Sequence, residues 1–448
     1  MKKQGRNIAV LLALLCLLPA IVSAQSLDLA TFIDLVESNS LDLENARTDR
    51  SLAEVQEQLA RTQLYPNIGG EIGYNRNLLD VEQELPIGAS TTAVQGIYPL
   101  QTQEMDVNSD NEFTMGFSLQ QNLFNMSVFR ALEASEQFTN LTGTAYEVAR
   151  QGILTEAKRL FFQTLLLQEV LEVRRASEEI ARDNYLETQR RFENGVASRL
   201  EVLRAEVNWK ITQPDTSQAE RNLNVALQNL RNFAGLDRTT EVVLTETLDE
   251  YPPLPSFENA FDRRNNRPDY QALAAQRRLR ELNVAAERAK FYPSLSASLT
   301  YGWQSSGDDF DLSNGSDSLS AGLSLTIPIF YGGSRFASLN QARLELQKTT
   351  TEIALQDDTI ATELETLRLT LEEANLRISS AEQTLETAER AYEVSQTSVD
   401  NGLATQLELK DARVSLERAR LNYVSAVFDY LSAYFDWQLA TGEGDQGL

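Results

Sequence analysis

Four segments of the chain alternate strictly between apolar and polar residues. They are residues 67–75, 112–120, 294–303 and 318–327. A period of two predicts β-strands with one apolar face, and each segment has roughly the ten residues that a tilted strand needs to cross a bilayer. The intervening positions are mostly Ser, Thr, Asn, Gln and Gly, and aromatic residues gather at the segment ends. A half-buried sheet of a soluble protein shows the same alternation, but these two details favour a membrane strand with a wet inner face.

The four segments come in two pairs, which predicts β-hairpins at about residues 66–123 and 293–329. Long loops are expected inside them, at about residues 78–111 and 305–317. Four strands are too few to close a barrel, and lipid does not tolerate an open sheet edge. Other copies of the chain must therefore complete the sheet, and a cyclic trimer with twelve strands is the natural solution. The sequence requires an oligomer but does not count its subunits.

Between the strands the apolar spacing becomes that of helices. No proline occurs from residue 330 to residue 401, and apolar residues recur there every seven positions in two interleaved series. One series is Leu364, Leu371, Ile378 and Leu385, and the other is Leu367, Ala374 and Ala381. The spacing predicts a long helix with a coiled-coil seam, followed by a returning helix. In the less regular first half, Pro214 predicts a kink or a break in the returning helix.

One stretch of sequence occurs twice. Residues 185–207 and 392–414 are identical at nine of 23 aligned positions, which predicts two internal repeats. We expect repeat 1 over residues 25–250 and repeat 2 over residues 251–448. Each repeat would hold a shorter helix, a β-hairpin and a long helical hairpin. The shorter helices are expected at about residues 29–65 and 257–292, and an extended proline-rich linker at residues 251–255.

The first 24 residues predict a secretory signal peptide. A basic start is followed by an apolar stretch from residue 8 to residue 22 and by Ala24 at a small-residue cleavage site. Cys16 lies within the apolar stretch and follows two leucines, which favours a filler role over lipid attachment. Beyond this segment, no apolar stretch reaches the length of a transmembrane helix.

Composition narrows the chemistry. The chain has no histidine, and its one cysteine lies in the signal peptide, which excludes disulfides, Cys/His zinc sites and histidine-dependent triads. We therefore expect no enzyme, no metal and no cofactor. The net charge of −25 repels nucleic acid and favours cations, although most of these carboxylates are best interpreted as solvated surface groups.

Several local motifs accompany this order of elements. They are Arg267-Pro268-Asp269, Tyr292-Pro293-Ser294-Leu295-Ser296, Ile327-Pro328-Ile329-Phe330 and Asn401-Gly402-Leu403-Ala404-Thr405. Together with the duplicated order of helix, hairpin and helical hairpin after a signal peptide, they resemble the TolC-like outer membrane efflux protein family. The resemblance covers the whole mature chain.

The resemblance implies a mixed fold: a homotrimeric 12-stranded β-barrel in the outer membrane of a Gram-negative bacterium, continuous with a long α-helical coiled-coil barrel in the periplasm. It also implies passive export with no catalysis. The partners would be outer membrane lipid, a periplasmic adaptor (membrane fusion) protein and an inner-membrane pump of the RND, ABC or MFS type.

By the same resemblance, the two helical hairpin turns contact the adaptor. These turns are Asn194, Gly195, Val196, Ala197 and Ser198, and Asn401, Gly402, Leu403, Ala404 and Thr405. The alternative is ordinary chain reversal, with Asn-Gly supplying positive φ between two helices. Both interpretations can hold together.

Acidic rings that narrow the pore in the family fall on Glu408 and Asp411, whose first-half equivalents are Glu201 and Arg204. Three copies around an axis would concentrate negative potential, although a solvated helix face is the competing interpretation. Where the family has a closing arginine, this chain has Ala404, so Arg199 or Arg204 is left as its possible replacement.

Three functions fit these observations. The first is the exit duct of a tripartite efflux system, and the second is the outer membrane component of a type I protein secretion system. The third is a non-conducting periplasmic scaffold, against which the polar strand faces argue, because a solid structure would prefer an apolar core.

Overall fold

The computed structural model describes residues 25–79, 82–87, 101–106, 109–248, 250–310 and 313–444. The predicted signal peptide, residues 1–24, lies outside these described residues. The chain divides into two compact units. Unit 1 holds the residues up to 51, residues 141–275 and those from 350 onwards, and unit 2 holds residues 52–140 and 276–349.

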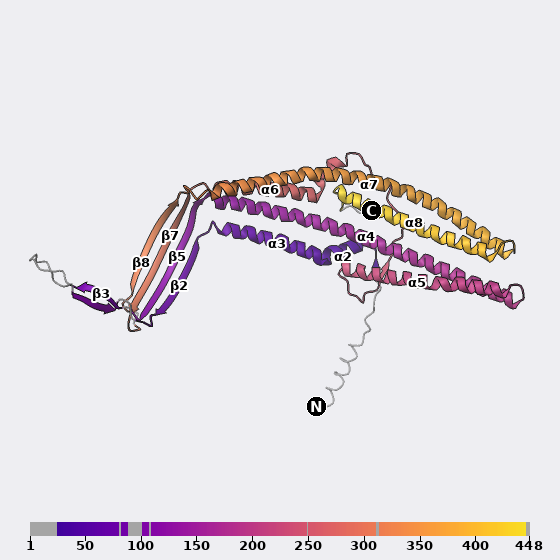
Figure 1. Cartoon of the computed structure of the whole chain (residues 1–448), viewed down its shortest axis with the longest axis horizontal. Helices are drawn as coiled ribbons and strands as arrows, with labels where there is room; N and C mark the ends of the chain where they lie inside the picture. Colours follow the sequence, from indigo (N-terminus) through magenta and orange to yellow (C-terminus); the bar gives the residue numbers. More distant parts are fainter. Residues whose placement is uncertain are drawn as a thin grey trace, which may run out of the picture. The chain divides into compact units, whose positions relative to one another are not determined.

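Unit 2 contains a four-stranded antiparallel sheet (Figure 1). Its strands, in spatial order, are β2 (Asn67–Arg76), β5 (Asn111–Asn125), β7 (Ser294–Gly307) and β8 (Ser316–Thr326). Each alternating segment of the sequence is therefore a strand. Among the described residues β2 and β8 have one neighbour each, so the sheet is open at both edges rather than closed.

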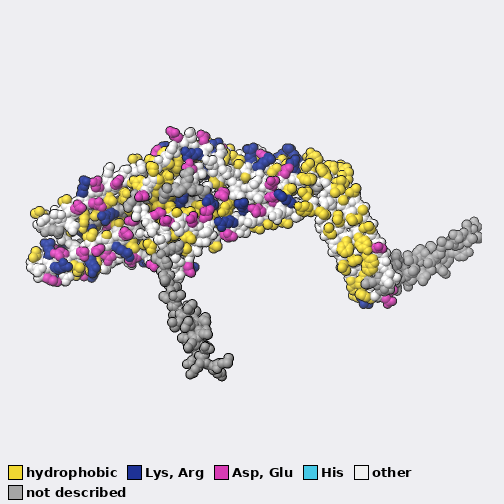
Figure 2. Space-filling model, turned by 180° about the vertical axis from the view of Figure 1, so that it is seen from behind, with side chains coloured by type: hydrophobic (Ala, Val, Ile, Leu, Met, Phe, Trp, Pro, Cys, Tyr) yellow, Lys and Arg dark blue, Asp and Glu magenta, His cyan; other side chains and the backbone are white. Residues whose placement is uncertain are grey.

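The pairing register gathers the apolar positions of the strands on one face. Residues directly opposite each other in an antiparallel pair share a face. Ile72 lies opposite Met115, which in turn lies opposite Trp303, whereas Ser118 lies opposite Thr300 on the other face. Ile72 is 83% exposed, and hydrophobic side chains gather over the sheet (Figure 2). The single chain thus leaves the apolar face of this sheet open.

Strand β5 carries one residue more than its partner. Asn122 lies opposite Ser296, but Phe124 lies opposite Leu295, so Leu123 has no opposite residue. This is a β-bulge, in which two residues of one strand face a single position of the next. The bulge places Phe124 on the same face as Leu295.

A further hairpin lies between β2 and β5 in the sequence. It consists of β3 (Glu82–Ile87) and β4 (Gln101–Asp106), paired antiparallel. The expectation of one long loop at residues 78–111 is therefore wrong over these two strands. Their six-residue sequences, EQELPI and QTQEMD, hold too few apolar residues to show a period of two. The second loop is also shorter than expected, since β7 continues to Gly307.

Helices make up most of the described chain. They are α2 (Leu29–Asn39), α3 (Leu41–Thr62), α4 (Met126–Glu193), α5 (Arg199–Phe233), the 3₁₀ helix η1 (Phe261–Asn266), α6 (Pro268–Ala289), α7 (Ser334–Asp400) and α8 (Gln406–Ala440). Unit 1 also holds a short parallel pair, β1 (Gln25–Leu27) with β6 (Val242–Leu244). Within the described ranges, no helix combines the length and apolar character that crossing a membrane would take.

Each of the two shorter helices is interrupted once, which corrects the expectation of single helices at residues 29–65 and 257–292. Ser40 separates α2 from α3 with ψ of 122°, and Arg267 separates η1 from α6 with ψ of 125°. Pro268 explains the second break, because a residue before proline is pushed out of the helical region. At each break a helix-ending glycine packs closely: Gly235 against Asn39, and Gly442 against Asn266.

Pro214 does not break its helix. Helix α5 runs through it from Arg199 to Phe233, so of the predicted kink or break the break is wrong. An interior proline costs about 3 kcal/mol because it removes one helical hydrogen bond. Contacts with α4 on the C-terminal side hold the helix in place: Thr216 Oγ1 donates to the Arg174 carbonyl (3.5 Å), and Arg175 pairs with Glu220 (2.7 Å).

The core of unit 1 confirms the predicted coiled-coil seam. Leu364, Leu371 and Ile378 of α7 are buried in one cluster with aromatic residues of α4 and α8. Phe162 and Phe435 within it have ring centroids 5.5 Å apart. Burial of large side chains such as these stabilises a domain by about 1.5–3 kcal/mol each.

Replacement of Leu371 by alanine should therefore destabilise unit 1 strongly. The side chain is fully buried, and Leu→Ala at such a site typically costs 2–5 kcal/mol because it leaves a cavity. Thermal unfolding followed by helical circular dichroism measures the loss. Leu41→Ala is the matched control, since Leu41 is exposed. Equal shifts for the two variants would contradict the assignment of the seam to the core.

Candidate functional site

The two long helical hairpins reverse direction through turns of the same geometry. Gly195 and Gly402 hold φ of 75° and 73°. Their N–H groups donate to the carbonyls three residues earlier (2.9 and 3.0 Å). The N–H groups of Val196 and Leu403 donate to the carbonyls five residues earlier (both 2.8 Å). These are the bonds of a Schellman C-cap, which satisfies the last carbonyls of α4 and α7.

Each turn continues into a capping box. The Glu201 N–H donates to Ser198 Oγ (3.3 Å), and the Ser198 N–H donates to Glu201 Oε2 (2.6 Å). Thr405 and Glu408 repeat this pair of bonds at 3.3 and 2.8 Å. The two boxes satisfy free N–H groups at the starts of α5 and α8. Two of the three predicted constriction residues are therefore also the residues that build the turns.

Asp411 differs from these two glutamates. It is exposed on α8, and no ion pair of its side chain occurs among the described residues. Its backbone carbonyl accepts from Ser415 Oγ (2.8 Å), as in an ordinary helix. Of the predicted constriction residues, Asp411 is the one whose carboxylate is not engaged in the turn.

The apolar residue of each turn points into solvent. Val196 is 69% exposed and Leu403 is 83% exposed, whereas the following alanines, Ala197 and Ala404, are half-buried. An apolar side chain held this far out on a rigid turn gains nothing from the fold of its own chain. The turns therefore present a small apolar surface that is available to a partner.

A groove of about 840 Å³ separates the two hairpins beside their turns. Val196, Ala197 and Glu201 line it from one hairpin, and Ala404 and Thr405 from the other. The structure thus brings residues of both predicted turns to one surface. Glu408 and Asp411 are absent from the residues that line this groove.

The groove that Ala404 lines also contains an arginine. Arg204 lines it together with Ala404. Arg199 instead places its guanidinium over the Phe192 ring, 6.0 Å from the centroid. Of the two arginines that the sequence leaves open, Arg204 is the one that shares a surface with Ala404.

Electrostatics around the first turn favour the ionised form of Glu201. Hydrogen bonds from the Ser198 backbone and side chain, aided by the charges of Arg191 and Arg204, hold the pKa of this carboxyl below its usual value of 4.5. The ionised carboxylate is a better acceptor than the neutral acid for the N–H of an N-cap residue. The capping box is therefore intact at neutral pH.

Sequence reasoning missed a buried polar link between the hairpins. Arg413 of α8 is only 8% exposed and donates to the Ser177 carbonyl (2.7 Å) and hydroxyl (2.8 Å) of α4. Ser177 Oγ donates to Glu417 (2.5 Å), which also binds Arg174. Burial lowers the pKa of Arg413. The spacing of Arg413 and Glu417 is a visible signal, but their partners lie more than 200 residues away.

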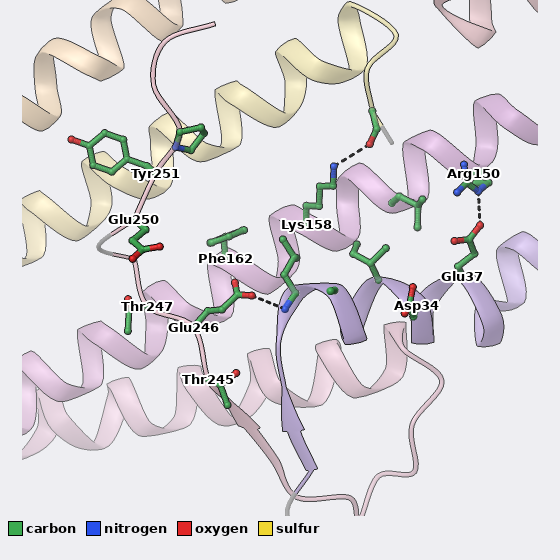
Figure 3. A pocket seen from close by; sticks show the side chains of 16 residues that line it. Asp34, Glu37, Arg150, Lys158, Phe162, Thr245, Glu246, Thr247, Glu250 and Tyr251 are labelled. Atoms are coloured by element: carbon green, nitrogen blue, oxygen red, sulfur yellow. Dashed lines mark hydrogen bonds and ion pairs between the residues drawn. The ribbon is translucent and has the colours of Figure 1, made fainter. Parts of the chain in front are cut away.

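A second cavity, of about 910 Å³, lies in unit 1 near the chain end (Figure 3). Several of its charged side chains have partners within the chain: Arg150 Nε donates to Glu37 (2.6 Å), and Glu246 accepts from the Leu29 N–H (2.9 Å). Lys158 Nζ donates to the Gly444 carbonyl (3.0 Å). These contacts hold α2, α4 and the chain end together, which is a structural role.

Comparison with known proteins places this arrangement in one family. The family model described as outer membrane efflux protein matches residues 32–236 and 262–443. The chain belongs to the outer membrane efflux protein family, as the motifs predicted.

Two curated relatives and one solved structure illustrate the similarity. The alkaline protease secretion protein AprF of Pseudomonas aeruginosa is 24% identical over 65% of this chain, and the match spans 58% of AprF, less than two thirds of its length. The outer membrane protein TolC of Vibrio cholerae is 22% identical over 70% of this chain and 68% of TolC. The outer membrane channel CmeC of Campylobacter jejuni has the same fold, with a TM-score of 0.74, 19% identity and coverage of 93% of this chain and 86% of CmeC.

Replacement of Gly402 by alanine should loosen the second turn. No atom lies within 4 Å of the added Cβ, so the cost is the backbone strain of φ at 73°, about 1 kcal/mol. Hydrogen exchange of the Leu403 amide should accelerate about fivefold. Gly152→Ala is the matched control, since this helical glycine also has free space and alanine there should stabilise α4. A slower Leu403 amide in Gly402→Ala would refute the turn geometry.

The Glu201 capping box should make the first turn sensitive to acid. A lowered carboxyl pKa contributes stability above about pH 4.5, and this contribution is lost as the pH falls through the lower folded-state value. Glu201→Gln should therefore be less stable than the parent at pH 7 and equal to it near pH 3. Thermal unfolding at several pH values measures the difference. Glu193→Gln, outside the box, is the control, and a difference that persists at pH 3 would exclude the mechanism.

Proposed function

We propose that this protein is the outer membrane exit duct of a tripartite export system and conducts its substrates passively. The observation that carries the proposal is the family match together with a two-faced sheet and paired helical hairpins. The relatives named above are outer membrane and secretion proteins, which supports an outer membrane location and a role other than catalysis.

The open sheet supports assembly from several copies. Strands β2 and β8 carry unpaired backbone groups along their outer edges, and such edges are costly in lipid. Three copies joined edge to edge would form the 12-stranded transmembrane barrel, with apolar faces outwards and Ser and Thr faces inwards. The helical hairpins of the three copies would then form the α-helical barrel, and each chain would contribute two internal repeats.

Matching geometry in the two halves supports those repeats. Both turns have the same C-cap bonds and the same capping box, and both shorter helices are interrupted at a residue with ψ near 120°. A duplicated unit accounts for these agreements with one folding pattern.

The turns are the proposed contact with a periplasmic adaptor. Val196 and Leu403 stand out from rigid backbones, and the groove beside them widens the available surface. Preorganised apolar anchors of this kind lose little entropy on binding. The same adaptor would connect the duct to an inner-membrane pump, which supplies the energy.

The proposed constriction consists of Glu201, Glu408 and Asp411. The capping boxes hold the carboxylates of the two glutamates at the turns. Within the described part of the chain the Asp411 carboxylate has no ion pair, and in three copies it would make the larger contribution to cation selectivity. Arg204 is the first-half counterpart and would oppose this field.

A second candidate is type I secretion of proteins. The similarity to a protein named for alkaline protease secretion favours it. Both functions use the same duct and differ in the pump and the cargo.

The reconstituted protein should conduct small, cation-selective currents in planar bilayers. Asp411→Ala should raise conductance and lower the cation-to-anion permeability ratio by about twofold, because a ring of three charges is lost. Glu408→Ala should also change the gate, but through a weakened turn. Asp49→Ala on α3 removes one charge from the same unit and is the control.

Unchanged currents in Asp411→Ala would remove it from the constriction. A detergent-solubilised complex with the mass of a single chain would contradict the trimer and the closed barrel. An adaptor that binds Leu403→Asp as well as the parent protein would contradict the proposed role of the turns.

A further inference from the structure

The charges next to the sheet follow one order in all four connections to the helices. Moving from the sheet into each helix, the first charged residue is basic: Arg61 before β2, Arg130 after β5, Lys290 before β7 and Arg335 after β8. The helix dipole favours basic residues at helix C-termini, where Arg61 and Lys290 lie, but not near N-termini, where Arg130 and Arg335 lie. The dipole therefore does not account for the common order.

The directions of the strands bring these four residues to the end of the sheet where the strands meet the helices, which we call the helix edge. Asn67 lies opposite Gln120, and Ser294 lies opposite Thr326, so the start of β2, the end of β5, the start of β7 and the end of β8 coincide. Neighbouring strands are about 4.8 Å apart, so the edge is about 15 Å wide. All of these residues belong to unit 2.

Three of these four basic residues have an acidic partner, and each partner lies further from the sheet along the chain. Arg61 pairs with Glu57, Arg130 with Glu133 and Lys290 with Glu287, each at 2.6 Å. In every pair the acid is three or four residues further from the strand than the base. The basic end of each pair therefore faces the sheet along the chain.

Arg288 adds a fifth basic group, and with only three paired acids this edge keeps a net positive charge. Among the described residues, Arg288 and Arg335 have no ion pair, and the Arg335 guanidinium lies 4.0 Å from the centre of the Tyr331 ring. A guanidinium over an aromatic face keeps its full charge, and the N–H groups at its periphery can still donate hydrogen bonds. Lys and Arg side chains gather on the helices next to the sheet (Figure 2).

Exposed aromatic residues lie between the strands and the basic groups. They are Tyr65, Tyr292, Phe330 and Tyr331. Tyrosine and phenylalanine at a sheet end prefer the boundary between hydrocarbon and headgroups. One helical turn rises 5.4 Å, so the basic groups stand about one turn beyond that boundary, at the depth of lipid phosphates.

The opposite edge of the sheet has the opposite charge. Asp110, Glu112, Asp308, Asp309 and Asp317 gather there, with Arg76 4.0 Å from Asp110. The sheet thus presents a basic edge toward the helices and an acidic edge away from them. A surface suited to anions exists at the helix edge and not at the other.

We propose that the basic helix edge of the sheet binds the phosphates of anionic phospholipids in the membrane leaflet on the helix side. Arg288, Lys290 and Arg335 are the principal donors, and the aromatic residues set their depth. This inference rests on the proposed function, because it requires the sheet to lie in a bilayer. Arginine and lysine near an anionic surface each contribute about fivefold in binding.

The test compares two lipids around the reconstituted protein. Spin-labelled phosphatidylglycerol and phosphatidylcholine are added in turn to the full chain in phosphatidylcholine vesicles, and the ratio of their association constants is measured. We expect a ratio of at least about threefold in favour of phosphatidylglycerol, falling toward one at 1 M salt. The combined variant Arg288→Gln, Lys290→Gln and Arg335→Gln should lose the preference without added salt.

A charge-matched variant removes three basic residues further from the edge. It combines Arg277→Gln and Arg278→Gln on α6 with Arg343→Gln on α7. Arg343 lies about 12 Å further along α7 than Arg335. This variant should keep the preference. Arg288→Lys with Arg335→Lys should keep it as well, which guards against loss through misfolding.

Three results would overturn the inference: no preference in the parent protein, an unchanged preference in the edge variant, or an equal loss in both glutamine variants. Bilayer conductance is recorded on the same samples. Conductance with no lipid preference overturns this inference and leaves the exit duct standing. A protein that neither conducts nor floats with vesicles overturns the proposed duct and, with it, the inference.

Discussion

Backbone polar groups that leave water must find partners, and this requirement governs both the sheet and the turns. At the turns the chain meets this requirement by itself. The C-cap bonds around a positive-φ glycine satisfy the last carbonyls of one helix, and a capping box satisfies N–H groups at the start of the next. At the sheet the chain does not meet it, because β2 and β8 each keep an unpaired edge. The turns are therefore complete within one chain, whereas the sheet gains from joining others.

Elements with a regular apolar pattern could be predicted from the sequence, whereas elements without one could not. Periods of two and of seven predicted the four main strands and the seam of α7, because each pattern reports one face that is apolar along a whole element. The β3–β4 hairpin was not predicted, because its two six-residue sequences hold too few apolar residues to show a period. The helix breaks at Ser40 and Arg267 were not predicted, because they depend on local packing. Pro268 was nevertheless a usable signal for the second break.

The candidate site was predictable in position but less so in chemistry. Asn-Gly marked both turns, and the Ser-x-x-Glu and Thr-x-x-Glu spacings that form the capping boxes are legible in the sequence. These spacings assign Glu201 and Glu408 to capping boxes that bind backbone N–H groups, beside their proposed role at the pore. The link from Arg413 to Ser177 was not predictable, because the sequence alone does not bring α8 beside α4.

The β-bulge at Leu123 has an evolutionary consequence. The residue pairs on either side of it, Asn122 with Ser296 and Phe124 with Leu295, would remain matched if Leu123 were deleted. Helix α4 begins at Met126, three residues after Leu123, so its start would keep its place against the sheet. A change of one residue in length is thus absorbed where strand passes into helix. Elsewhere in the sheet the same deletion would turn every later side chain to the other face.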